Sequence, residues 1–151
     1  MPPSADVESF LALTMVAQVA TLSQKGRPFV TPLWFVVHAG RLYMATGRDT
    51  RAVRNIGHHP ETVLLFTGAR GGTAGGVLRM HGTASVHQGM PPLRILLRIA
   101  RKYYLAPGGL VNELSHARQW GLRQRYYGQG KAAYLEVVPD TAEFLSVPSR
   151  C

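Results

Sequence analysis

The residues best suited to chemistry lie in one segment, which runs from Tyr43 to Ile56. It combines hydroxyl side chains with three arginines, Arg48, Arg51 and Arg54, around an expected turn and helix start. Free N–H groups at a helix start and nearby guanidinium groups together suit a phosphate group. The alternative is that the arginines, spaced i, i+3 and i+6, form a solvated helix face, and the pattern alone favours that interpretation.

Conventional catalytic groups are not apparent elsewhere in the sequence. The 8 acidic residues are scattered, and no pair is spaced for general acid and base catalysis. The histidines His58, His59, His81 and His87 have a spacing more typical of solvated surface residues than of a metal site, so no metal is expected. We therefore expect either a bound cofactor that carries out the reaction or no reaction at all.

Composition and charge narrow the class of protein and of partner. Of 151 residues, 46% are hydrophobic and 17% are charged, which is sufficient for one globular domain. Lys and Arg outnumber Asp and Glu by 17 to 8, and 14 of the 17 are arginine. This excess suggests an anionic partner, which is a nucleic acid, an acidic membrane surface or a small phosphorylated ligand. A GC-rich coding bias explains the arginine preference equally well.

Cysteine content and hydropathy bear on the cellular setting. The single cysteine, Cys151, excludes an intramolecular disulfide and a metal site built on paired thiolates. No apolar run reaches the roughly 18 residues of a membrane span, and residues 1–6 lack the basic start and apolar run of a signal peptide. We expect a cytoplasmic protein.

The elements that would hold the Tyr43–Ile56 segment are mostly short strands. Helices are expected at about 6–14, at 50–56 and in two pieces between 91 and 127, and strands at 16–23, 29–38, 41–46, 62–67, 77–86, 131–138 and 141–147. Residues 29–38 are apolar on both faces, which predicts a strand buried on both sides, and Pro32 within it requires an edge, a bulge or a ligand-facing gap. Gly57 is expected to end the second helix.

This order predicts a mainly β fold with peripheral helices (α+β), an antiparallel β-barrel that forms a single domain over residues 1–151. Residues 91–127 would form a helical insert. Its first piece carries an apolar stripe separate from a face with Arg94, Arg98 and Arg101. The stripe consists of Leu93, Leu96, Leu97, Ala100 and Tyr104. Basic and aromatic residues between 91 and 127 also fit a nucleic-acid-binding surface, which we consider unlikely because an amphipathic helix pair explains the same pattern.

The order and spacing of several motifs resemble the pyridoxamine-phosphate-oxidase-like split β-barrels. The motifs are Val19-Ala20-Thr21-Leu22, Gly26 to Phe35, Arg41 to Thr46, Thr50-Arg51-x-Val53-Arg54-Asn55, and Met80-His81-Gly82-Thr83-Ala84. Together they cover about residues 16–86 in register, close to half of the chain.

This resemblance implies an FMN-binding split β-barrel that forms a homodimer. It implies a cofactor, coenzyme F-420 (a deazaflavin) or FMN, at the subunit interface, and hydride transfer between that cofactor and a small organic substrate. The cofactor-binding residues it implies are Val30, Thr31, Pro32, Leu33 and Trp34 along the ring, and Thr46, Gly47, Arg48, Arg51, Arg54 and Asn55 around the phosphate. No side chain is expected to be a catalytic acid or base.

Two further points follow from the resemblance. Coenzyme F-420 carries more negative charge than FMN, so the arginine-rich groove suits it slightly better. Relatives often carry a lysine at the position of Ala52 that helps to hold the phosphate. Arg48 or Arg51 would compensate for that lysine, or the cofactor would bind weakly or not at all. A non-catalytic binder of a flavin, haem or a lipid on the same fold is the alternative.

Overall fold

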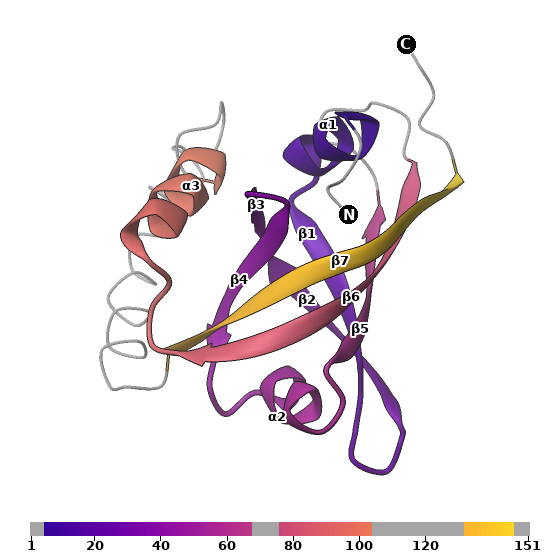
Figure 1. Ribbon diagram of the computed structural model, residues 1–151, viewed down its shortest axis with the longest axis vertical. Helices are drawn as coiled ribbons and strands as arrows, with labels where there is room; N and C mark the ends of the chain where they lie inside the picture. Colours follow the sequence, from indigo (N-terminus) through magenta and orange to yellow (C-terminus); the bar gives the residue numbers. More distant parts are fainter. Residues whose placement is uncertain (1–4, 68–75, 104–131, 147–151) are drawn as a thin grey trace, which may run out of the picture.

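A computed structural model describes residues 5–67, 76–103 and 132–146 of the chain. Within these ranges, seven antiparallel strands form one sheet that curls into a half-barrel, with helices at its ends (Figure 1). The elements are α1 (Ala5–Leu13), β1 (Val16–Leu22), β2 (Pro28–Trp34), β3 (Val36–His38), β4 (Arg41–Gly47), α2 (Arg51–His58), β5 (Glu61–Thr67), β6 (Val77–Gln88), α3 (Leu93–Tyr103) and β7 (Ala132–Ser146). This architecture is the predicted one.

The sheet curls because one residue joins its two edges. The strand order is β2-β1-β5-β6-β7-β4-β3, so β2 and β3 are the two edge strands. Only Phe35 separates Trp34, the end of β2, from Val36, the start of β3. The two edges must therefore lie close together in space, and the fully buried side chain of Phe35 lies between them.

Alternating side chains of the strands fill the interior of the barrel. Each of the central strands directs every second residue inward, in agreement with the period of a half-buried strand. The fully buried side chains of these strands include Leu42, Met44, Leu64, Phe66, Leu78, Met80, Leu135 and Val137. Burial of each such side chain contributes about 1.5–3 kcal/mol, so this core holds the strands that carry the predicted site.

The predicted strand at 29–38 is wrong in one respect. It is divided into β2 and β3, and β2 is not buried on both sides, since its residues are all exposed or half-buried. The side chain of Val30 is 61% exposed. Strand β2 lies at the edge of the sheet and also has an apolar outer face, so both of its faces carry apolar residues although neither is fully buried. The edge position that Pro32 suggested is confirmed.

The two strands predicted at 131–138 and 141–147 form one strand, β7, in the described range 132–146. The ladder between β6 and β7 contains an irregularity at the expected gap between the two strands. Gly82 pairs with Pro139 and His81 pairs with Thr141, so Asp140 is the extra residue of a bulge. The bulge accommodates Pro139 without ending the strand.

The second helix is longer than predicted. Thr50 is its N-cap, and the Thr50 Oγ1 accepts a hydrogen bond of 3.4 Å from the Val53 N–H. The expected end at Gly57 is wrong, because the helix continues to His58 and the His59 N–H donates to the Asn55 carbonyl. This ending needs no left-handed residue, so no glycine is required there.

The buried face of α3 also differs from the prediction. Leu93 and Leu97 are 71% and 61% exposed, whereas Ile95 and Tyr103 are buried and Ile99 packs beside them on the sheet. The stripe formed by Ile95, Ile99 and Tyr103 has the same helical spacing as the predicted stripe. Packing against β3 determines that this stripe is the buried one. Tyr104 and the second predicted helical piece lie outside the described residues.

Candidate functional site

The residues predicted to hold a phosphate meet where β4 leads into α2, at the opposite end of the barrel from α1 and α3 (Figure 1). Thr46 and Gly47 end β4 and are buried. Arg48, Arg51 and Arg54 are exposed. This junction therefore presents guanidinium groups rather than hydroxyl groups to solvent.

These guanidinium groups are available for an anion. The Arg48 Nε lies 4.0 Å from the Asp49 carboxylate, and both side chains are more than half exposed, so the pair contributes little. Among the residues that the structure describes, no carboxylate forms an ion pair with Arg51 or Arg54. The N–H groups of the first helical turn also lack intrahelical acceptors, apart from the one that Thr50 caps.

A cation–π contact joins this junction to β2. The Arg51 guanidinium carbon lies 4.2 Å from the centre of the Phe29 ring, near the start of β2. Residues Val30 to Trp34 continue from there along the edge of the sheet. Because β2 pairs with β1 alone in the described part of the chain, one side of its backbone has no strand partner.

The other end of β2 is fixed by α3. The Trp34 and Tyr103 rings stack with centroids 4.5 Å apart and planes within 6° of parallel. The Tyr103 hydroxyl accepts a 2.9 Å hydrogen bond from the Phe35 N–H and lies 2.7 Å from the carbonyl oxygens of Met15 and Phe35. Burial raises the pKa of Tyr103, so the phenol stays neutral at physiological pH.

Two positions near the arginines face the interior instead. The Asn55 Nδ2 donates a 3.0 Å hydrogen bond to the Thr21 Oγ1, and both side chains are buried. Ala52, at the position where relatives often carry lysine, is 1% exposed. The structure therefore brings Arg51 to β2, but it directs the Asn55 side chain toward β1.

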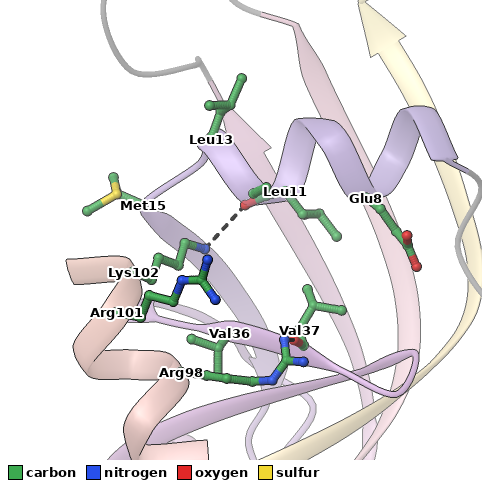
Figure 2. Close-up of a pocket in the computed structure, with 10 residues that line it drawn as sticks. Glu8, Leu11, Leu13, Met15, Val36, Val37, Arg98, Arg101 and Lys102 are labelled. Atoms are coloured by element: carbon green, nitrogen blue, oxygen red, sulfur yellow. Dashed lines mark hydrogen bonds between the residues drawn. The ribbon is translucent and has the colours of Figure 1, made fainter. Parts of the chain in front are cut away.

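Sequence reasoning missed a cleft of about 600 Å³ between α1, β3 and α3 (Figure 2). Lys102 lies in its wall, where the Nζ donates 3.2 Å hydrogen bonds to the carbonyls of Leu11 and Phe35. The same nitrogen lies 3.7 Å from the centre of the Phe35 ring. Burial lowers the pKa of Lys102 to about 7. No sequence motif marks this lysine, because its surroundings come from three separate elements.

No group of three or more His, Cys, Asp or Glu side chains in the described ranges is placed to hold a metal ion. None of the helices in those ranges has both the length and the hydropathy for crossing a membrane.

Comparison with known proteins gives a family and a fold. A family model described as pyridoxamine 5'-phosphate oxidase matches residues 4–145. No curated protein sequence matches the chain. Solved structures with low sequence identity have the same fold.

Three of these structures illustrate the range. A conserved hypothetical protein from Mycobacterium tuberculosis has a TM-score of 0.68 at 14% identity, and the match covers 100% of this chain and 92% of that one. HutZ, a haem storage protein from Vibrio cholerae, has a TM-score of 0.63 at 16% identity, with coverage of 95% and 95%. An F420 reductase has a TM-score of 0.63 at 16% identity, with coverage of 93% and 98%.

Proposed function

Because this chain belongs to the pyridoxamine 5'-phosphate oxidase family, as the match over residues 4–145 shows, we propose that it is a flavin-type oxidoreductase. It transfers a hydride between coenzyme F-420, or FMN, and a small organic substrate. The observation that carries this proposal is the open edge of β2, which begins beside the unpaired guanidinium group of Arg51.

The residues present fit such a cofactor. Arg48, Arg51 and Arg54 would hold its phosphate, because exposed guanidinium groups bind phosphate oxygens in a bidentate manner, and the exposed pair of Arg48 with Asp49 is weak enough to be displaced. The side of β2 that has no strand partner offers backbone donors and acceptors along the adjoining edge. A phosphate at the arginines and a ring along β2 require no contribution from a lysine at position 52.

When bound, the ring of either cofactor supplies the hydride chemistry. The chain contributes binding and orientation, since the arginines fix the phosphate end and the β2 backbone fixes the direction of the ring. Backbone N–H groups of β2 would also stabilise negative charge that develops next to them. Three arginines favour coenzyme F-420 over FMN, since the former carries more negative charge.

A second copy of the chain would complete the site. On the outer face of β2, β1 and β5, two cross-strand rows lie side by side, Val30–Ala20–Val63 and Pro32–Gln18–Leu65. Gln18 is the only polar residue of these rows, and the face is exposed or half-buried. An apolar surface next to an open edge suits a homodimer interface that borders the cofactor.

Haem binding without catalysis is the second candidate. The fold supports it, since one structural neighbour is a haem storage protein and another is a haem-binding protein from Mycobacterium smegmatis. The two proteins have folds similar to this one, at 16% and 15% identity. Titration with haemin distinguishes the two functions.

The test is an equilibrium titration of the purified protein with coenzyme F-420, FMN and haemin, followed by fluorescence or absorbance. We expect micromolar binding of coenzyme F-420 or FMN. Arg54→Gln should weaken that binding by about 1.5–3 kcal/mol, because a charge-assisted hydrogen bond to phosphate is lost. Arg101→Gln on α3 is the control and should leave it unchanged. Tight binding of haemin alone would contradict the oxidoreductase proposal.

A further inference from the structure

The cleft between α1, β3 and α3 has features that the proposed function does not use. Arg98, Arg101 and Lys102 project from α3 across it toward α1 and β3 (Figure 2). Glu8 on α1 is the only carboxylate among the described residues that line it. The lining therefore has an excess of positive charge. A volume of about 600 Å³ is within the range of small-molecule sites.

The positive groups of the cleft retain hydrogen-bonding capacity for a ligand. Arg98 Nη1 donates a 3.1 Å hydrogen bond to the Val37 carbonyl, which leaves its other N–H groups for a ligand. Neither Arg98, Arg101 nor Lys102 forms an ion pair with an acidic residue of the described ranges. Two guanidinium groups one helical turn apart can bind a carboxylate through parallel hydrogen bonds.

The rest of the lining is apolar. Leu13, Met15 and Val37 contribute side chains that are exposed or half-buried, and Leu13 is 52% exposed. Small-molecule sites are lined mainly by apolar side chains with a few polar groups, so these side chains in one cleft form a surface that suits an apolar group. A positively charged wall and an apolar wall in the same cleft suit an amphipathic ligand that has a negatively charged head group.

We propose that this cleft binds an organic monocarboxylate with an apolar body, such as a fatty acid, with its carboxylate at Arg98, Arg101 and Lys102. The head group is a single carboxylate rather than a phosphate because Glu8 offsets part of the positive charge. The site is separate from the proposed cofactor site, whose arginines lie at the opposite end of the barrel (Figure 1). It does not depend on the identity of the cofactor.

Protonation of Lys102 should be coupled to this binding. Its neighbours are the carbonyls of Leu11 on α1 and of Phe35 before β3, with Glu8 on α1 and Arg98 and Arg101 on α3 as the charged groups of the cleft. Since burial lowers the pKa of Lys102 to about 7, the free protein carries a mixture of ammonium and amine near neutrality. A bound carboxylate favours the ammonium form and raises this pKa, so the protein takes up protons on binding.

The experiment is isothermal titration of the purified full chain, free of added cofactor, with decanoate, and with decanol as the uncharged probe of equal length. We expect saturable decanoate binding at millimolar concentrations or below, and no binding of decanol at the same site. Arg101→Gln should weaken decanoate binding about tenfold. Arg94→Gln is the matched control, because it removes an exposed arginine of the same helix that does not line the cleft.

The pH dependence provides an independent readout. Decanoate should bind more tightly at pH 6 than at pH 8, and Lys102→Met should remove that difference while circular dichroism shows a folded protein. Absence of decanoate binding, or binding that Arg101→Gln and Arg94→Gln affect equally, would overturn the proposal. The variant Arg54→Gln tests whether the two sites are separate, since it should lose affinity for the cofactor and keep affinity for decanoate.

Discussion

At the scale of single residues, burial decides what a side chain can do. Asn55 has a suitable type and position for a cofactor contact, but its amide donates to Thr21 in the interior. Arg54, the residue before it, is exposed because successive helix positions point about 100° apart. The hydrogen bond between Asn55 and Thr21 thus attaches α2 to β1 and sets the direction in which the arginines point.

Asn55→Ala should therefore act on stability. We expect it to lower the free energy of unfolding by about 1–3 kcal/mol, because the buried Thr21 hydroxyl loses its donor. Urea denaturation followed by circular dichroism measures this change. Thr21→Val should produce a loss of similar sign by removing the other partner. A loss of cofactor affinity in Asn55→Ala that Thr21→Val does not share would instead show a direct contact between Asn55 and the cofactor.

The sequence predicts single residues well where their local pattern is decisive. Thr50 is the expected polar N-cap, and Pro32 lies at an edge as its missing N–H requires. Prediction from the sequence fails for Lys102, because its hydrogen-bond acceptors on Leu11 and Phe35 are far away in the chain. The cofactor contacts of β2 and α2 stay predictions.

At the scale of elements, helix periodicity alone does not identify a buried face. Helix α3 carries two apolar stripes, and the one that contains Ile95, Ile99 and Tyr103 packs on β3. The Tyr103 hydroxyl bonds to Phe35 and Met15 and so fixes the choice through long-range contacts. The predicted boundary between the last two strands is wrong for a related reason, because β7 tolerates Pro139 only through a bulge opposite β6.

That bulge depends on a glycine in β6. A Cβ atom at position 82 would lie 2.8 Å from both the Val138 carbonyl oxygen and the Val137 Cγ1. We expect Gly82→Ala to destabilise the protein by about 1–3 kcal/mol, since backbone cannot move aside as a flexible side chain can. Thermal unfolding measures the change.

Gly57 in α2 is the matched control for this glycine. A Cβ there would meet nothing within 4 Å, and alanine favours a helix interior. Gly57→Ala should therefore stabilise by about 0.5–1 kcal/mol. If the two variants change stability equally, the close approach of β6 and β7 at Gly82 has no energetic cost.

At the scale of the whole molecule, the outer face of β2, β1 and β5 is an apolar surface that has no role if the chain acts alone. Its two rows, Val30–Ala20–Val63 and Pro32–Gln18–Leu65, run across three strands that adjoin the open edge. Assembly through this face would place a second copy beside the proposed cofactor.

Val30→Lys tests this assembly. A lysine at a residue that is 61% exposed in the single chain does not disturb its core, but it places a charge in the proposed interface. We expect size-exclusion chromatography with light scattering to show a dimer for the unaltered protein and a monomer for Val30→Lys, with a parallel loss of cofactor binding. Thr141→Lys, at an exposed position of β7 outside this face, should remain a dimer. A monomeric unaltered protein would contradict the proposal.

The place of β7 in the sheet constrains how the protein is made. Strand β7 lies between β6 and β4, and it pairs residues 133–146 with residues 77–88 on one side and residues 132–137 with residues 42–47 on the other. The β3–β4 hairpin therefore has no neighbouring strand while the ribosome is still adding the residues that precede β7. Translation must pass residues 132–137, which pair with both β4 and β6, before the sheet can join its two halves, so the nascent chain exposes two unpaired strand edges until then. Chaperones that shield such edges during synthesis would act on this interval.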